Sequence, residues 1–197
     1  MPGGKSACTL CLPFAVGSAM CKDIFGADVE ILKLGSTSIE ESTLDLNFDT
    51  SSDIYQGTPV LIRPSRDIVN PVFESVKIAL EAPSTSTSTY TNFVGTFSPT
   101  TIDASPNNLF LGPENTLYFP ENSDQPIKGL RGWFVLHDAP ESIIQRARIV
   151  QNSQVVTAIE LTKEPDNNLK AQKVLRDGQL IIIRDGVRYS IQGQRIQ

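Results

Sequence analysis

Three two-residue turn signals divide residues 173–197 into four short runs rich in apolar residues. They are Asp177-Gly178, Asp185-Gly186 and Gln192-Gly193. Asp-Gly between β-forming residues is the strongest local signal for a β-hairpin, because glycine adopts a positive φ angle without steric cost and aspartate tolerates it. The segment is therefore predicted to form a small β-meander. Its apolar side chains are expected from Leu175, Leu180, Ile182, Val187, Tyr189 and Ile191.

Short strand-like runs between turn signals also fill the preceding part of the chain. The clearest is 44–49, in which Leu44, Leu46 and Phe48 alternate with aspartate and asparagine, so one face is predicted to be buried and the other solvated. Further strands are predicted within 7–14, 29–34, 56–64, 76–80, 90–97, 109–111, 117–119, 127–137, 146–150 and 155–161. Strands at this spacing, with turns between them, indicate an all-β fold: an antiparallel, jelly-roll-like β-sandwich.

The domain organisation follows from a polar segment near the end of the chain. Residues 162–172 contain a proline, two asparagines and several charged residues, which is typical of a linker. We therefore expect a β-sandwich domain over 1–161, a linker over 162–172 and a C-terminal β-meander tail over 173–197. A loop or short helical turn is expected at 17–26, a short helix at 140–146 and an exposed hairpin loop at 82–91.

The most apolar strand is predicted at 127–137, with Phe134 at the centre of the core. Leu130, Gly132, Phe134 and Leu136 are assigned to the buried face, and Arg131, Trp133 and Val135 to the other. Trp133 is interpreted as a packing residue. An aromatic platform for a sugar is the alternative.

Three cysteines, Cys8, Cys11 and Cys21, lie near the start of the chain. Cys8 and Cys11 have the spacing of redox and zinc sites, but they fall in a predicted strand, where residues three apart point to opposite faces. We interpret all three as buried small apolar side chains rather than a metal or redox site. Their odd number leaves open whether any two of them pair.

A second metal pattern is the string Asp45, Asn47 and Asp49, which matches the opening of an EF-hand calcium loop. Such a loop needs glycine at position six and glutamate at position twelve, where this chain has Thr50 and Gln56. A solvated strand face is therefore favoured over a calcium site.

Catalytic motifs do not emerge from the sequence. It contains no phosphate-binding loop, dinucleotide-binding motif or nucleophile elbow. The single histidine, His137, is interpreted as a side chain satisfied at a strand end rather than a general base. No catalytic, cofactor-binding or metal-binding residue is predicted, no cofactor is expected, and the ligand-binding residues stay unknown.

Charge and hydropathy narrow the class of partner. The net charge is −5 and the pI is about 4.9, which disfavours nucleic acid because its binding requires a basic surface. The sequence contains no run of about 18 apolar residues, so it predicts no transmembrane helix. Residues 7–20 resemble the core of a signal peptide, but Pro13 and Gly17 interrupt them, so we expect them within the fold and expect the true secretion signal to be missing or to lie upstream.

Several short motifs along 7–159 look like a β-sandwich region of large secreted surface proteins of Bacteroidetes, which often carry leucine-rich repeats or Ig-like modules. The motifs are Cys11-Leu12-Pro13-Phe14 and the segments 57–64, 93–97, 109–112, 128–134 and 147–149. The ending, at 157–159, 173–175, 178–182, 185–189 and 193–196, is similar to the tails of the same proteins. It also resembles the last strands of type IX secretion sorting domains.

The resemblance implies a secreted or outer-membrane cell-surface protein and transfers no catalytic residue. The leading hypothesis is a non-enzymatic module, the C-terminal part of an adhesin-like or scaffold protein, which binds an unknown protein or glycan. A carbohydrate-binding module is the alternative, and an exposed Trp133 with Tyr or Phe neighbours would favour it. An enzyme of unrecognised type is the third hypothesis, and a cleft holding His137 with an acid and a hydroxyl would favour that.

Overall fold

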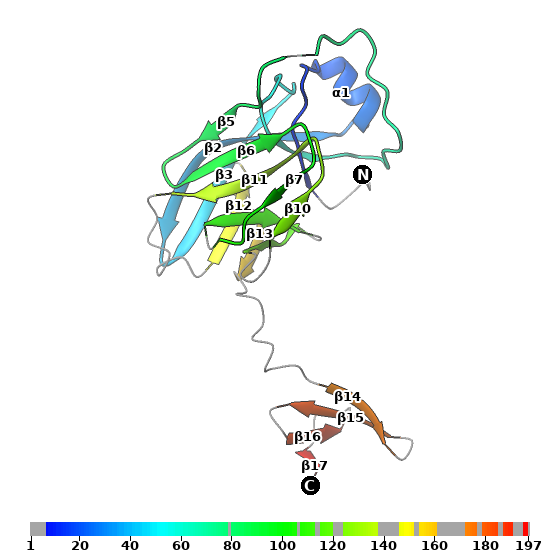
Figure 1. Ribbon diagram of the computed structural model, residues 1–197, viewed down its shortest axis with the longest axis vertical. Helices are drawn as coiled ribbons and strands as arrows, with labels where there is room; N and C mark the ends of the chain where they lie inside the picture. The colour runs from blue at the N-terminus through cyan, green and yellow to red at the C-terminus, as the bar shows by residue number, and fades with distance from the viewer. Residues whose placement is uncertain are drawn as a thin grey trace. The chain divides into compact units, whose positions relative to one another are not determined.

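The computed structural model in Figure 1 contains two compact units, Met1–Leu161 and Thr162–Gln197. It describes residues 7–78, 80–105, 107–112, 115–119, 124–137 and 147–151, together with the backbone of 146, 154–160, 172–176, 179–184, 187–190 and 195–196. The boundary between the units coincides with the start of the predicted linker. Strands predominate among the described residues, which confirms the all-β, sandwich-like fold class.

Six strands form the first sheet, in the order β1-β4-β2-β3-β12-β13. Their bounds are β1 (Cys8–Leu10), β4 (Val60–Arg63), β2 (Glu30–Glu40), β3 (Thr43–Ser51), β12 (Arg146–Gln151) and β13 (Gln154–Glu160). The predicted hairpin at 146–161 is confirmed by the antiparallel pairing of β12 with β13. The predicted antiparallel order is wrong for one pair, because β12 runs parallel to β3. A parallel pair needs a long connection, and the strands of the second sheet supply it here.

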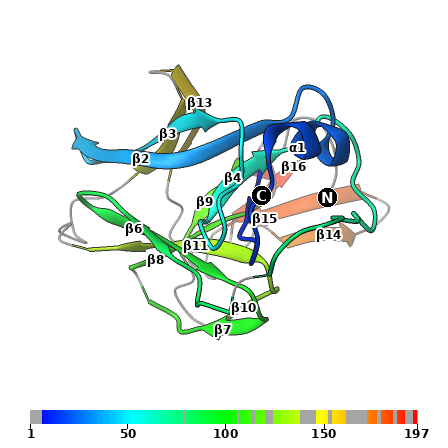
Figure 2. The same cartoon turned by 90° about the horizontal axis from the view of Figure 1, so that it is seen from above.

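Five strands form the second sheet, in the order β5-β6-β11-β8-β9. Their bounds are β5 (Thr85–Thr87), β6 (Thr91–Thr96), β11 (Arg131–Leu136), β8 (Asn108–Leu111) and β9 (Leu117–Tyr118). The hairpin predicted at 109–119 is confirmed by the pairing of β8 with β9. Strands β7 (Thr100–Ile102) and β10 (Gln125–Ile127) form a separate two-stranded ribbon. Figure 2 shows β2 and β3 in one layer and β6, β8 and β11 in the other.

Three phenylalanines from the two sheets meet at the centre of the core. Phe48, Phe93 and Phe134 are each at most 1% exposed. The rings of Phe93 and Phe134 stack with centroids 4.5 Å apart, and Phe48 meets both edge-on at 6.2 Å. Aromatic pairs in these geometries stabilise a core beyond the burial of their area. The central position predicted for Phe134 is confirmed.

A second apolar cluster lies around the helix α1 (Ser18–Phe25). The predicted loop or helical turn at 17–26 is thus a two-turn helix. It begins after Gly17 and ends before Gly26, whose φ of 104° is accessible mainly to glycine. Phe25 and Cys21 face the cluster, where they pack with residues of β1, β2 and β4.

Two predicted strands need correction. The strand at 76–80 does not form: among the described residues between β4 and β5 there is no strand, and Ile78 and Leu80 are exposed. An alternating run becomes a strand only when a neighbouring strand pairs with it. The strand at 127–137 is split, because Leu130 takes a φ of 61° in the turn between β10 and β11. Leu130 therefore leaves the buried face, while Gly132 and Leu136 stay on it.

Other predicted boundaries shift. The strand at 29–34 extends through Glu40, and the predicted loop at 82–91 contains the short strand β5. The helix predicted at 140–146 lies outside the described residues, except that β12 begins at Arg146.

The C-terminal unit, taken by itself, is a four-stranded antiparallel meander in the order β14-β15-β16-β17. Its strands are β14 (Gln172–Arg176), β15 (Gln179–Arg184), β16 (Val187–Ser190) and β17 (Arg195–Ile196). The register pairs Leu175 with Leu180 and Ile182 with Tyr189. Residues two apart on a strand share a face, so these four lie on one face of the sheet with Val187. Ile191, the sixth residue of the predicted set, lies outside the described residues.

Candidate functional site

All three cysteines lie within the described residues, and none is in a disulfide bond. Cys11 and Cys21 are buried, as predicted, and burial raises the pKa of each thiol to about 11. Cys8 is only half-buried, and its Sγ donates to the carbonyl oxygen of Ile62 at 3.7 Å. Because the thiolate is the reactive form of cysteine, Cys11 and Cys21 are weak nucleophiles at neutral pH.

The raised thiol pKa values predict a loss of stability at alkaline pH. In the unfolded chain a thiol loses its proton near pH 9.0, whereas Cys11 and Cys21 in the folded chain keep theirs up to about pH 11. Deprotonation therefore favours the unfolded state between these values, and the free energy of unfolding should fall as the pH rises. Urea unfolding at about pH 8 and about pH 10.5 measures this loss. The loss should be smaller in a Cys11→Ala/Cys21→Ala variant; equal losses in variant and parent would contradict the cause given.

Asp45 corrects the prediction that the acidic side of 44–49 is solvated. Its side chain is 10% exposed and accepts two hydrogen bonds from the Arg148 guanidinium, of which Nη2 to Oδ2 is 2.8 Å. The hydrogen bonds that Arg148 donates to the Asp45 carboxylate raise the pKa of Arg148. The two residues are register partners in the parallel β3–β12 pair, so the ion pair joins the two strands. A bidentate pair of this kind fixes geometry as well as adding energy.

The predicted EF-hand string is therefore divided between different environments. Asp45 binds Arg148, Asn47 is half-buried and Asp49 is exposed. In the part of the chain that the structure describes, no group of three or more His, Cys, Asp or Glu side chains is placed to hold a metal ion.

His137 follows β11 directly, where its backbone N–H donates to the carbonyl oxygen of Tyr90 at 3.0 Å. It is half-buried. The predicted position at a strand end is confirmed, and the interpretation of His137 as a satisfied side chain rather than a general base stays a prediction. Asp138, the acid beside it in the sequence, lies outside the described residues.

Trp133 belongs to a row of aromatic side chains on the outer face of the second sheet. The β11–β8 register places Trp133 and Phe110 on the same face of neighbouring strands, and Phe110 pairs with Tyr118 on β9. The rings of Phe110 and Tyr118 are 5.7 Å apart. Trp133 is half-buried and Phe110 is 6% exposed, so the row is partly covered. The sequence indicated Trp133 alone, because the contribution of β8 and β9 depends on strand order.

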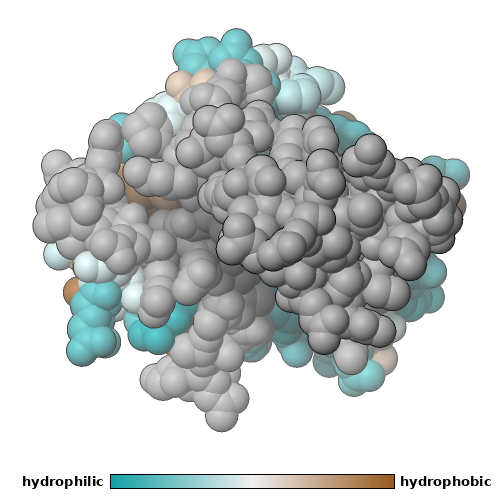
Figure 3. Space-filling model, turned by 90° about the horizontal axis from the view of Figure 1, so that it is seen from below, coloured by the Kyte–Doolittle hydropathy of each residue, from teal (hydrophilic) through white to brown (hydrophobic). Residues whose placement is uncertain are grey.

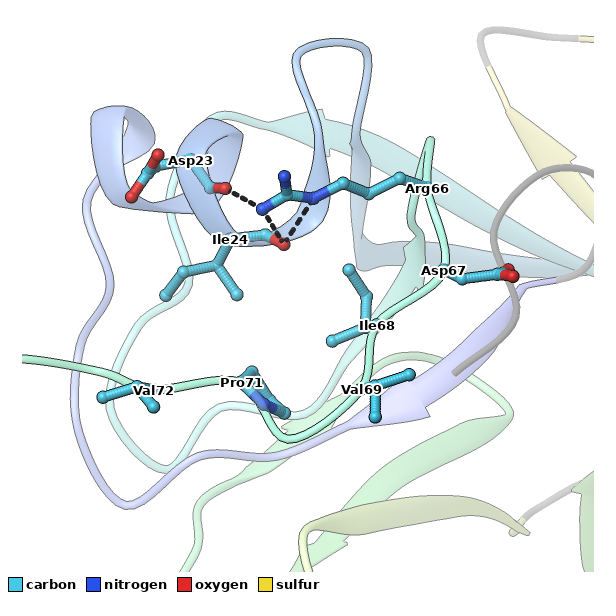
Figure 4. A pocket seen from close by; sticks show the side chains of 8 residues that line it. All are labelled: Asp23, Ile24, Arg66, Asp67, Ile68, Val69, Pro71 and Val72. Atoms are coloured by element: carbon cyan, nitrogen blue, oxygen red, sulfur yellow. Dashed lines mark hydrogen bonds between the residues drawn. The ribbon is translucent and has the colours of Figure 1, made fainter.

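A cavity of about 410 Å³ lies between α1 and the segment that follows β4 (Figure 4). Arg66 holds its two sides together. The Nε of Arg66 donates to the carbonyl oxygen of Ile24 at 3.1 Å, and Nη2 donates to the carbonyl oxygens of Asp23 and Ile24. The last carbonyl groups of a helix lack partners within the helix and attract a cation. Arg66 therefore serves the fold at this site.

Most residues that line this cavity are apolar, but polar atoms make up the larger part of its wall. In Figure 4, Ile24, Ile68 and Pro71 surround the empty space, while the Asp67 carboxylate points away from it. A second cavity of about 140 Å³ shares Pro71 with the first and is lined by Leu10, Phe25 and Phe73 among others. Sequence reasoning missed both cavities, because their walls come from α1, β1 and a segment without strands.

Among the coloured residues of Figure 3, hydrophilic ones prevail and hydrophobic ones form only small separate patches. Among the described residues, no helix has the length and apolar composition needed to cross a membrane.

No known protein family matches the sequence, and no curated protein or solved structure shows significant similarity to it. The functional assignment therefore depends on the residues and their geometry.

Proposed function

We propose that the chain is a non-enzymatic module of a secreted or cell-surface protein, the C-terminal part of an adhesin-like or scaffold protein. The observation that carries this proposal is the division into a two-sheet unit and a separate four-stranded unit. A rigid sandwich positions its loops for contact with a ligand. The small second unit offers a separate element that a secretion machinery can bind, in line with its resemblance to the last strands of type IX sorting domains.

The larger unit has a hydrophobic core of its own. The two hydrophobic clusters that the structure describes consist of residues from the larger unit. The described strands β14 to β17 pair with one another. We therefore expect the larger unit to fold without the smaller one.

A chain that ends at Leu161 tests the proposal. We expect it to unfold cooperatively, with a melting temperature lowered by only a few degrees, about what 1 kcal/mol produces in a protein of this size. In a Bacteroidetes host that has type IX secretion, its display on the surface should fall strongly relative to the full chain. Surface labelling with an antibody against the larger unit measures display, and total expression is the control. Normal display of the truncated chain would contradict the role given to the second unit.

Carbohydrate binding is the second candidate function. The aromatic row of Trp133, Phe110 and Tyr118 supports it, because aromatic rings on neighbouring strands, about 4.8 Å apart, offer a flat surface to sugar rings. Partial burial of the row limits the area open to a ligand.

A glycan array with the full chain tests this second candidate. If the row binds sugars, Trp133→Ala should lower the signal on the bound glycans at least tenfold, which corresponds to about 1.4 kcal/mol. Tyr55→Ala is the matched control, since Tyr55 is an exposed aromatic residue outside the row. Equal signals from Trp133→Ala and the parent would exclude the row as the binding surface.

A further inference from the structure

The cavity of about 140 Å³ beside α1 has a buried apolar floor and a mouth that reaches solvent. Leu10, Leu12 and Phe25 form the floor and are 1–3% exposed. Pro71 and Leu130 are exposed and lie at the mouth. A small apolar group can therefore enter this cavity without opening the core. We call it the Leu130 pocket.

The volume and the lining of the Leu130 pocket favour a single aromatic ring. A cavity of roughly 150 Å³ lined by leucine, isoleucine and phenylalanine excludes water and binds benzene. The Leu130 pocket is nearly as large and has a similar lining. Phe25 and Phe73 belong to its wall, and their rings are tilted by 53° with centroids 6.0 Å apart. Rings at such angles offer edge-to-face contacts to an aromatic ring, so a benzene-sized group suits the pocket.

Arg131 adds a positive charge to the wall of the pocket. Its Nη1 donates to the carbonyl oxygen of Thr9 at 2.8 Å, and its guanidinium also lies beside the Cys8 thiol. Arg131 is half-buried, and in the described part of the chain no carboxylate forms an ion pair with it. A guanidinium has more N–H donors than these two contacts use. Arginine can donate two parallel hydrogen bonds to a carboxylate, so a ring that carries a carboxylate complements both parts of the wall.

The walls of the Leu130 pocket are held in place by contacts with the rest of the fold. Leu130 has a φ of 61°, and its carbonyl oxygen accepts a hydrogen bond from the N–H of Cys11 at 3.1 Å. A positive φ costs energy in a residue other than glycine, and such strained residues concentrate at ligand-binding sites. Phe73 packs against Phe14 with ring centroids 5.1 Å apart. A preformed pocket of this kind loses little conformational freedom when a ligand binds.

We propose that the Leu130 pocket binds a small aromatic carboxylate, with its ring in the apolar cavity and its carboxylate at the Arg131 guanidinium. Ligand sites commonly combine an apolar lining, which takes the ligand out of water, with a few polar groups that fix its orientation. Here the buried floor has the first role and Arg131 the second. Binding of such an acid goes beyond the proposed adhesin-like role and does not depend on it.

A titration of the full chain with phenylacetate, followed through its methyl NMR signals, tests the proposal. We expect saturable shifts of the Leu10 and Leu12 methyl signals with a Kd of about 1 mM or below, an affinity within reach of so small a ligand. The methyl signals of Ile68 should shift less, because Ile68 lines the larger cavity. Unchanged signals of Leu10 and Leu12 at about 20 mM phenylacetate, well above that Kd, would overturn the proposal. Larger shifts at Ile68 would also overturn it, since they would place the ligand in the other cavity.

Ligands with the same ring but a different charge test the contact with Arg131. Phenylacetate should bind at least about fivefold more tightly than benzylamine at low salt, with the neutral benzyl alcohol between them. Arg131→Gln should raise the Kd of phenylacetate by a similar factor and leave the Kd of benzyl alcohol nearly unchanged. The unchanged alcohol shows that the pocket of the variant is intact. Equal Kd values for the three compounds, or equal effects of Arg131→Gln on acid and alcohol, would overturn the contact between carboxylate and arginine.

The same chemistry, a ring beside a carboxylate, also occurs at the end of a peptide that terminates in phenylalanine. N-acetylglycyl-phenylalanine, titrated in the same way, distinguishes the two sources. A lower Kd for this peptide than for phenylacetate indicates a chain end, and a higher Kd indicates a free acid. Failure of both compounds to bind would overturn the proposal.

Variants at the mouth separate ligand binding from stability. Leu130→Gly and Leu130→Asn remove the apolar side chain, while both new residues adopt a positive φ more readily than leucine. Their melting temperatures should equal or exceed that of the parent, and their Kd for phenylacetate should rise at least about threefold because apolar contact is lost. Leu80→Asn is the matched control, since Leu80 is fully exposed and does not line the pocket, and it should bind like the parent. An unchanged Kd in both Leu130 variants, or an equal rise in Leu80→Asn, would overturn the proposal.

Discussion

Replacing Phe134 with alanine should lower the free energy of unfolding by about 3–5 kcal/mol, the usual cost of removing a fully buried aromatic ring. Phe134 is 0% exposed and stacks on Phe93 at 4.5 Å, while Phe48 meets its edge. The three rings belong to three strands of two sheets, so a cavity at Phe134 cannot close without moving a sheet. Chemical denaturation in guanidinium chloride measures the loss.

Trp133→Ala is the matched control for this prediction. Trp133 is the next residue on β11, but it points to the outer face and is half-buried. Its replacement should cost less than half as much as that of Phe134, because less area is buried and the outer face can rearrange. Equal losses from the two variants would show that the outer face is packed as closely as the core.

Gly132→Ala is expected to destabilise the protein by about 1–3 kcal/mol, as overpacking does in a close-packed interior. A Cβ atom at Gly132 would lie 2.8 Å from the Val94 carbonyl oxygen and 2.9 Å from Cε2 of Phe93. The first is backbone of the neighbouring strand β6 and the second is part of the central ring stack. Neither can move without disturbing the sheet or the core. Thermal and urea unfolding of the variant measure the effect.

Gly17→Ala provides the comparison. The nearest atom to its Cβ would be Oδ1 of Asp53 at 3.9 Å, an ordinary contact, and its backbone φ of −75° suits any residue. We expect a loss of about 1 kcal/mol or less, since alanine is a poorer N-cap residue than glycine but meets no steric conflict at this position. If Gly132→Ala and Gly17→Ala lower the free energy of unfolding equally, steric overlap at Gly132 is not the cause of the loss.

Local alternation located most strands because each of those strands has one buried face. At 44–49 the apolar residues Leu44, Leu46 and Phe48 are buried as the alternation predicts, although Asp45 is buried as well. The same rule failed at 76–80, where Ile78 and Leu80 alternate as in a strand but have no neighbouring strand to pair with. The alternation at 127–137 also predicted one continuous strand, without the turn at Leu130. The chain needs this turn to pass from β10 to β11, which belong to different sheets.

The candidate surfaces were less predictable than the strands. The aromatic row combines β11, β8 and β9, and the cavities combine α1, β1 and the segment that follows β4. These residues are far apart in the sequence and share no motif. Their proximity depends on strand order, which local patterns do not encode.

The sequence by itself determined the fold class, the central place of Phe134 and the four strands of the C-terminal meander. Each of these depends on side-chain alternation and turn residues, which act over a few neighbouring positions. Only the tertiary structure decided that β12 lies parallel to β3, that Asp45 is buried against Arg148, and that Ile78 and Leu80 are exposed. These features depend on contacts between distant segments, where pairing and packing select among arrangements that local preferences leave equally favourable.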